Sequence, residues 1–317
     1  NAGKIDAIRS GAETPLDPYM AYLHERGLAA AHVADLNGRK SYADTQPTPL
    51  PDDAYCDNWL AQNALDLLKA APDDRPWHLV VNFTGPHNPM DVTQAMYDRY
   101  QGVDFPQPHA SAAERDRAQS RNYPAPEQHT QIRRNYSAMV ENIDRWVGIF
   151  VAELARRGEL EHTIIVFSSD HGDMLGDHAL WAKTQPYQPS IGVPLIIAGP
   201  GVREGVQCDA PVSLIDLAPT FLDWAGVAVP AEMDGRSLAG LLSGERDAPR
   251  SVVRSALGAW RLAFDGRFKL VAGYRHPSEP EGTDAALRLF DLARDPQETV
   301  DVATSRPDVV ERLRPYL

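Results

Sequence analysis

Asp170 and His171 stand side by side where a buried strand is expected to end. Residues 163–169, TIIVFSS, form an almost continuous run of β-branched and apolar side chains, which is typical of a buried strand. Ligands of open α/β sheets bind just beyond the carboxyl ends of the strands. A carboxylate oxygen beside an imidazole nitrogen suits a divalent cation, so the pair is a candidate metal half-site. The alternative is a surface Asp-His-Gly turn whose histidine only packs.

The elements that must position this pair follow from hydrophobic spacing. Apolar residues at three- and four-residue steps predict helices, and short runs of β-formers predict buried strands. Strands separated by helices indicate an α/β fold with a largely parallel sheet and helices on both faces. The predicted helices are 54–69, 132–154 (ended by Gly158) and 216–225, the predicted strands are 77–83, 163–169 and 193–198, and residues 102–130 are expected to be irregular.

The pattern changes after about residue 245. Residues 260–264 and 267–271 flank Asp265-Gly266, and this arrangement predicts a hairpin because Asp-Gly tolerates the positive φ of a two-residue turn. A strand over 287–292 and a helix over 307–316 complete the pattern. We therefore expect a small antiparallel subdomain of strands and a helix over 246–317, packed on the main sheet.

Composition excludes some classes of partner. Apolar residues make up 43% of the 317 residues, and the formal net charge of −13 disfavours nucleic acid and anionic membrane surfaces. No apolar run reaches the length of a membrane span, and no signal peptide is visible, so the compartment stays open between cytoplasm and periplasm. The two cysteines, Cys56 and Cys208, are expected to be isolated thiols, with one disulfide between them as the alternative.

Several segments, taken in chain order, resemble the sulfatase branch of the alkaline phosphatase superfamily, which includes formylglycine-type sulfatases and phosphonate monoester hydrolases. The resemblance covers most of residues 75–305 and corresponds to the C-terminal two-thirds of such an enzyme. Its segments are TGPHNP (84–89), YSAMVENIDRWVG (136–148), SSDHGDMLGDHALWAK (168–183) followed by Tyr187 and VPLIIAGPG (193–201), VSLIDLAPTFLDWAGV (212–227), MDGRSL (233–238) and LFDLARDPQETVDVA (289–303).

The resemblance assigns roles to individual residues. Asp170 and His171 would ligate the metal, and His87 and Lys183 would contact the sulfuryl oxygens or the leaving oxygen. A histidine can donate a proton to a leaving alkoxide, and a lysine can offset charge on a sulfuryl group. Lys4, in a segment similar to the family's G-K-x-H, would bind the anion, although Asp6 stands where histidine is usual. Taken alone, His87 fits a turn histidine and Lys183 a solvated lysine.

The resemblance also implies an alkaline phosphatase-like fold, with residues 1–245 forming the C-terminal part of the catalytic domain. The implied cofactors are one divalent metal ion, calcium first with manganese, zinc or magnesium as alternatives, and a formylglycine made in an upstream C-x-P-S-R or S-x-P-S-R segment. Neither that segment nor the family's Asp-Asp pair occurs in this chain. We therefore expect the chain alone to be inactive.

Three explanations for the missing segment stay open: an upstream part of the same protein, which we favour, a separate N-terminal fragment, or an inactive natural truncation. The expected function of the complete protein is hydrolysis of a small-molecule sulfate ester. Hydrolysis of a phosphonate monoester or phosphodiester on the same scaffold is the first alternative, and a non-catalytic binding or scaffold protein is the second. Gln188 and Gly192 stand where the family often has Glu and Arg, so substrate preference stays open, as does a homo-oligomer.

Overall fold

A computed structural model describes residues 17–119, 123–279 and 285–317 of the chain. Lys4 and Asp6 lie outside the described residues. Contacts between Cα atoms divide the chain into two compact units, each of which is described by itself. The first unit runs up to Pro108 and continues from Gln119 to Leu160, and the second comprises His109–Ala118 and Glu161–Leu317.

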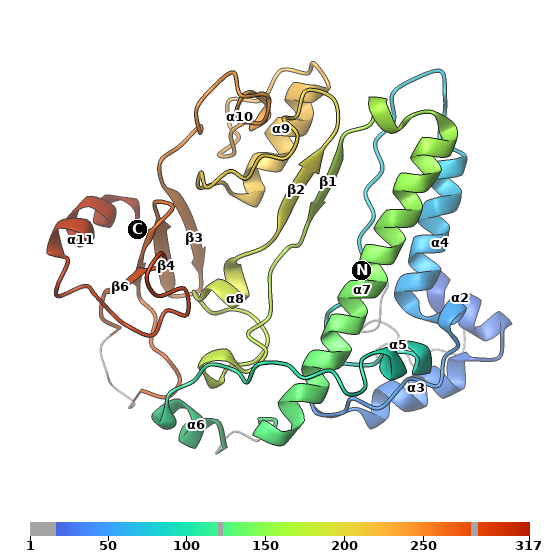
Figure 1. Ribbon diagram of the computed structural model, residues 1–317, viewed down its shortest axis with the longest axis horizontal. Coiled ribbons are helices and arrows are strands. Elements are labelled where there is room, and N and C mark those ends of the chain that lie inside the picture. The colour runs from blue at the N-terminus through green and yellow to red at the C-terminus, as the bar shows by residue number, and fades with distance from the viewer. Residues whose placement is uncertain (1–16, 120–122, 280–284) are drawn as a thin grey trace. The chain divides into compact units, whose positions relative to one another are not determined.

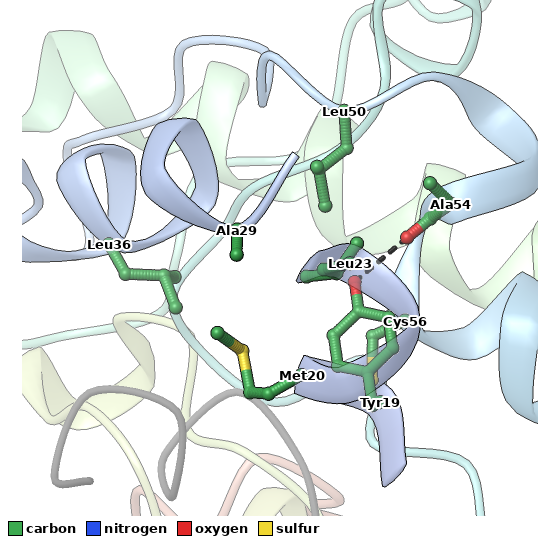
Figure 2. Close-up of a cluster of buried hydrophobic side chains, with 8 residues drawn as sticks. All are labelled: Tyr19, Met20, Leu23, Ala29, Leu36, Leu50, Ala54 and Cys56. Atoms are coloured by element: carbon green, nitrogen blue, oxygen red, sulfur yellow. Dashed lines mark hydrogen bonds between the residues drawn. The ribbon is translucent and has the colours of Figure 1, made fainter. Parts of the chain in front are cut away.

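The first unit is helical (Figure 1). A hydrophobic cluster packs its N-terminal helices against the start of α4, and the hydroxyl of Tyr19 donates to the carbonyl of Ala54 over 2.8 Å (Figure 2). Cys56 is part of this cluster and only 2% exposed. The helices of this unit are α2 (Pro18–Glu25), α3 (Ala29–Gly38), the 3₁₀ turn η1 (Asp52–Ala54), α4 (Cys56–Lys69), α5 (Gln94–Arg99) and α7 (Pro126–Arg157), and η2 (Leu160–His162) follows them.

The long helix α7 lies beside α4 and α5 (Figure 1). It confirms the predicted helix and begins earlier, at Pro126, where proline suits the first turn. It ends at Gly158, which adopts the left-handed conformation (φ 72°) that favours glycine. Ala61 and Leu65 of α4 meet Trp146 of α7 in a shared apolar cluster.

Two sequence expectations for irregular and extended segments were wrong. Residues 77–83 form no strand: their burial alternates as in a strand, and Phe83 packs against the α4–α7 cluster, but no described segment pairs with their backbone. Residues 102–130 are not wholly irregular, because α6 (Ala112–Gln119) forms within them. Its sequence is polar, so hydrophobic spacing gave no signal for it.

The second unit contains the two strands that lead to the candidate site. Strand β1 (Ile165–Ser168) pairs antiparallel with β2 (Leu195–Ala198), in the register Ile165↔Ala198. Both strands were predicted, but every strand pair in the described residues is antiparallel, so the expected parallel pairing does not occur among them. The remaining helices of this part are η3 (Asp177–Ala179), α8 (Gln188–Ile191), η4 (Leu214–Asp216), α9 (Leu217–Trp224) and α10 (Ala239–Ser243).

The C-terminal part of this unit is a four-stranded antiparallel sheet in the order β3-β4-β5-β6 (Figure 1). The predicted hairpin forms, but Phe264 pairs with Lys269, so the two central turn residues are Gly266 and Arg267, one position later than expected. Strand β3 was not predicted. The elements are β3 (Val253–Leu257), β4 (Trp260–Phe264), β5 (Phe268–Ala272), β6 (Arg288–Asp291), α11 (Pro307–Leu313) and η5 (Arg314–Tyr316).

Two expectations about the whole chain can be compared with the structure. Cys56 and Cys208 are both free thiols, as expected. Within the described ranges, no helix is long and apolar enough to cross a membrane. The division of the chain at residues 245 and 246 stays a prediction.

A buried ion pair sits at the centre of the C-terminal sheet. The ammonium of Lys269 on β5 meets the carboxylate of Glu298, and both side chains are fully buried. Lys269 also donates to the carbonyl of Pro186 over 2.6 Å, and the other oxygen of Glu298 accepts from the backbone N–H of Gln188 over 2.6 Å. Burial lowers the pKa of Lys269, and the charge of Glu298 opposes this. The pair therefore anchors the chain at residues 186–188 to the sheet.

Replacing one member of this pair should be costly. Lys269→Met leaves the Glu298 carboxylate buried without its counter-charge, so the free energy of unfolding should fall by about 3–5 kcal/mol. The double variant Lys269→Met/Glu298→Gln removes both charges and should recover most of that loss. Urea denaturation of the two variants and the parent protein measures the difference. A double variant no more stable than Lys269→Met would contradict this role.

Candidate active site

Asp170 and His171 lie close together just beyond β1, as the sequence predicted. Oδ2 of Asp170 is 3.6 Å from Nε2 of His171, and the Asp170 side chain is 85% exposed. Nδ1 of His171 lies 2.8 Å from the carbonyl oxygen of Gly172. Since a carbonyl can only accept, Nδ1 donates to it, and Nε2 is the ring nitrogen that lies beside the carboxylate. This is the arrangement of a metal-binding histidine whose other nitrogen is held by the backbone.

The turn after this pair is closely packed. The backbone N–H of Gly172 donates to the carbonyl of Ser190 over 2.9 Å. A Cβ on Gly172 would lie 2.0 Å from the carbonyl oxygen of Pro189, so only glycine fits here. The candidate ligands are therefore held by a backbone contact between the end of β1 and α8.

Lys183 lies in a strained stretch of backbone. Its neighbours Ala182 and Thr184 both have positive φ, at 62° and 83°. Residues without glycine's freedom hold such angles at a cost of about 1–3 kcal/mol each, and only where surrounding contacts impose them. Here the indole N–H of Trp260 donates to the carbonyl of Thr184 over 2.9 Å. Trp260 of the C-terminal sheet therefore fixes the backbone next to Lys183. Lys269 and Glu298 fix the following residues, Pro186 and Gln188, as described above.

The loop between Asp170 and Lys183 is fixed from a second side by His178. Its ring stacks on the Tyr187 ring with centroids 4.0 Å apart, and its Nδ1 lies 3.4 Å from Oε1 of Glu114. Oε1 of Glu114 is also 3.6 Å from Nε2 of His276. Burial opposes ionisation of Glu114, but hydrogen bonds from His178 and Ser111 outweigh it and lower the pKa of Glu114 from 4.5 to about 2.

Tyr187 is part of this packing. It is 4% exposed, and burial raises the pKa of its phenol, so it stays neutral at physiological pH. Tyr187 therefore has a packing role in this structure.

His87 belongs to the first unit, where a buried carboxylate holds its loop. Asp57 is fully buried at the start of α4 and accepts hydrogen bonds from the backbone N–H groups of Thr84 (2.7 Å) and Gly85 (3.0 Å). Nδ1 of His87 lies 2.6 Å from the carbonyl oxygen of Asn88 and therefore donates to it. Nδ1 of His171 donates to a backbone carbonyl in the same way. The peptide bonds Gly85-Pro86 and Asn88-Pro89 are cis.

The structure thus brings together some of the predicted residues and not others. Asp170 and His171 are neighbours in space, and Lys183 lies in the same unit. His87 lies in the other unit, and Lys4 lies outside the described residues. In the part of the chain that the structure describes, no group of three or more His, Cys, Asp or Glu side chains could hold a metal ion. Among the residues that the structure describes, Asp170 and His171 are therefore two donors without a third.

Comparison with known proteins identifies the family. The family model "Sulfatase" matches residues 22–227 of the chain. The chain belongs to the sulfatase family. Among curated relatives it is 32% identical over 307 residues to a choline-sulfatase of Rhizobium meliloti (strain 1021), covering 89% of this chain and 58% of that protein. It is 26% identical over 310 residues to an arylsulfatase of Clostridium perfringens (strain 13 / Type A), covering 91% and 62%.

A solved structure supports the same fold. The phosphonate monoester hydrolase SpPMH from Silicibacter pomeroyi superposes with a TM-score of 0.80 at 25% identity, covering 95% of this chain and 68% of that one. This confirms the expected alkaline phosphatase-like fold. The chain spans about three fifths of the length of the two curated sulfatases it matches.

Some sulfatase-like segments prove to be structural. The buried carboxylate of Asp216 accepts from the backbone N–H groups of Ser213 (2.9 Å) and Arg236 (2.8 Å) and pairs with Arg250. A Cβ on Gly235 would lie 1.9 Å from the carbonyl oxygen of Ile215. The MDGRSL segment is thus held tightly against the start of α9.

Sequence reasoning missed the side chains that hold the site residues in place, above all Asp57, Trp260 and Lys269. One signal was present for Lys269, because a lysine between apolar neighbours in RFKLV is unusual in a buried strand. Asp57 and Trp260 carried no comparable signal, since polar and aromatic residues are common near helix starts and in strands.

The loop of His87 can be tested through its glycine. A Cβ on Gly85 would lie 2.4 Å from Oδ2 of Asp57, so Gly85→Ala must displace this buried carboxylate. We expect a loss of about 1–3 kcal/mol in the free energy of unfolding, because the amides bound by Asp57 lose their acceptor. Gly148→Ala on α7, where a Cβ meets nothing within 4 Å, is the control and should not destabilise the protein. Equal stability of both variants in urea would contradict the assigned role of Asp57.

Glu114 should make stability depend on acid pH. Its folded pKa is lowered, so its contribution is complete above about pH 4.5 and is lost as the pH falls from about 4.5 toward 2. The destabilisation caused by Glu114→Gln should therefore be largest at neutral pH and shrink by about pH 3. Urea denaturation across this range measures it. A difference that stays constant, or grows, on acidification would show that the charge of Glu114 is not what stabilises the loop.

Proposed function

We propose that this chain carries one part of the active site of a metal-dependent sulfuric ester hydrolase. The observation that carries the proposal is the orientation of His171, whose Nδ1 is committed to the Gly172 carbonyl while Nε2 stands 3.6 Å from a carboxylate oxygen of Asp170. Family membership and the choline-sulfatase and arylsulfatase relatives support a sulfate ester as the substrate.

Asp170 and His171 would hold a divalent ion. A hard carboxylate oxygen with a borderline imidazole nitrogen is compatible with calcium, manganese, zinc or magnesium, and calcium is our first choice from the family resemblance. Two protein donors do not complete a coordination shell, so further ligands would have to join them. When bound, the ion would draw charge from the sulfuryl oxygens.

Lys183 and His87 would act on the ester itself. The ammonium of Lys183 would offset the charge that the sulfuryl oxygens carry in the transition state, and its strained backbone would keep it in place. Protonated Nε2 of His87 would donate its proton to the leaving alkoxide, because Nδ1 is already held by the Asn88 carbonyl. Lys4 would contribute to anion binding. The expected formylglycine has no place in this chain, and we assign no nucleophile within it.

Phosphonate monoester hydrolysis is a second candidate function. The observation that favours it is the superposition on SpPMH with a TM-score of 0.80. Both reactions move charge onto the oxygens around a tetrahedral centre, so the same lysine and histidine would serve either substrate. A sulfate monoester carries one negative charge, as does a phosphonate monoester, and charge alone does not separate them.

The metal assignment is tested by removing a ligand. In the purified protein, Asp170→Ala should lower metal affinity by about 100-fold or more. Loss of a residue that only orients a metal ligand lowers affinity by about 10- to 100-fold, and loss of the ligand itself should lower it at least as much. Metal analysis and calorimetric titration with Ca²⁺ and Mn²⁺ measure this without any assay of turnover. Glu204→Ala, which removes an exposed acid elsewhere in the same unit, should bind metal normally. Unchanged metal content in Asp170→Ala would refute the assignment.

The substrate class is tested with matched aryl esters. The protein should hydrolyse 4-nitrophenyl sulfate with a kcat/KM at least about tenfold above that for the 4-nitrophenyl ester of phenylphosphonate. The reverse order would favour the second candidate. Intact mass belongs with the assay, because we expect turnover only when an upstream segment accompanies this 34.9-kDa chain. Metal binding without hydrolysis of either ester, in a sample that contains such a segment, would favour a binding protein.

A further inference from the structure

A polar hollow opens on the first unit, among α4, α5 and α7, and no residue assigned above to the active site lines it. Its volume is about 460 Å³. Figure 1 shows the three helices close together in this unit. One face of α7 supplies Asn142, Arg145 and Trp146, and α4 supplies Asn58.

Asn142 has buried donors without a partner. Its side chain is only 6% exposed, and its Oδ1 accepts from Nη2 of Arg145 over 3.0 Å, which fixes the orientation of the amide. Its Nδ2 then has two N–H groups with no hydrogen-bond partner. Buried donors are nearly always satisfied in native proteins, so one that lines an open hollow indicates a group that binds there.

Arg145 is exposed, and contacts with three side chains hold its guanidinium in place. Its Nη2 donates to Oδ1 of Asn58 (3.1 Å) and of Asn142, and its guanidinium lies 4.8 Å from the centre of the Trp146 ring. Burial lowers the pKa of Arg145. Among the described residues its hydrogen bonds go to amide oxygens, no carboxylate lies within ion-pair distance of it, and the charge of Asp52 acts on it from farther away.

The floor of the hollow is preorganised. Oδ1 of Asn58 also accepts from the indole N–H of Trp146 over 2.6 Å, and Nδ2 of Asn58 donates to the carbonyl of Asp52 over 2.8 Å. The oxygen of Asn58 thus accepts two hydrogen bonds, and one N–H of its Nδ2 donates within the protein. The donors that stay available for a ligand are Nδ2 of Asn142 and the Nε and Nη1 groups of Arg145.

The rim of the hollow has the opposite charge. Asp52, Asp53 and Glu141 line it, and Glu141 forms an ion pair with Arg99 over 2.7 Å. Acidic groups near the entrance repel a ligand with several negative charges and attract a positive one. The exposed guanidinium of Arg145 and the buried amide of Asn142 together offer N–H donors that suit a planar carboxylate.

We propose that this hollow binds a small zwitterionic carboxylate, with the carboxylate on Arg145 and Asn142 and the cationic end toward the acidic rim. The carboxylate would meet the unpartnered Nδ2 of Asn142, and the cationic end would meet Asp52, since Asp53 and Glu141 already pair with Arg26 and Arg99. The site is independent of the proposed hydrolase activity.

Calorimetry with glycine, acetate and sulfate tests the proposal, with a chelator present so that no probe binds a metal. Glycine should bind more tightly than acetate, because only glycine offers a positive group to the rim. If sulfate binds at all, its affinity should be the same for Arg145→Met and for the parent protein. Equal affinities would show that sulfate binds outside the hollow. No heat from glycine or acetate up to about 50 mM would overturn the proposal.

Asn142→Asp is the sharpest variant. It keeps an acceptor for Arg145, so the fold should be retained, but it removes both Nδ2 donors and adds a charge that repels a carboxylate. Glycine binding should weaken by about tenfold or more in this variant and in Arg145→Met. Two control variants remove an amide and a guanidinium that do not line the hollow: Asn63→Leu on α4 and Arg156→Met on α7. Both variants should bind glycine as the parent protein does. Equal glycine affinity in Asn142→Asp and the parent protein would refute the site.

Discussion

The buried contact between Lys269 and Glu298 is the interaction on which the second unit depends. Two charges without access to water are tolerated only when each finds further polar partners, and here those partners are the carbonyl of Pro186 and the N–H of Gln188. The ion pair therefore cannot form unless the chain at 186–188 lies against the sheet. Through this requirement, a strand near the C-terminus determines where the candidate lysine, Lys183, is held.

The two candidate histidines make the same local hydrogen bond although they lie in different units. In each, Nδ1 donates to the carbonyl of the following residue, Gly172 for His171 and Asn88 for His87. This local bond orients each ring in the same way relative to the backbone. In the roles proposed above, it would support a metal ligand in one place and a proton donor in the other, so the surroundings and not the histidine would determine the role.

Sequence reasoning succeeded where the signal was local. The spacing of α7, the stop at Gly158 and the strands β1 and β2 follow from side chains within one element. It failed where contacts with residues distant in the sequence determine the local structure. Residues 77–83 have the alternation of a strand but no described neighbour, and the turn of the β4–β5 hairpin moved by one residue because pairing of Phe264 with Lys269 sets the register. The pairing of Asp170 and His171 was visible in advance, but the contacts that support Lys183 come from residues more than 75 positions away.

The short segment His109–Ala118 belongs to the second unit although the chain on both sides of it belongs to the first. Its contacts, from His109 to Asp177 and from Glu114 to His178 and His276, join residues separated by 64 to more than 160 positions. During synthesis, this segment leaves the ribosome long before its partners exist. These contacts of the second unit can therefore form only after its C-terminal residues have been made, and no single cut in the chain would separate the two units.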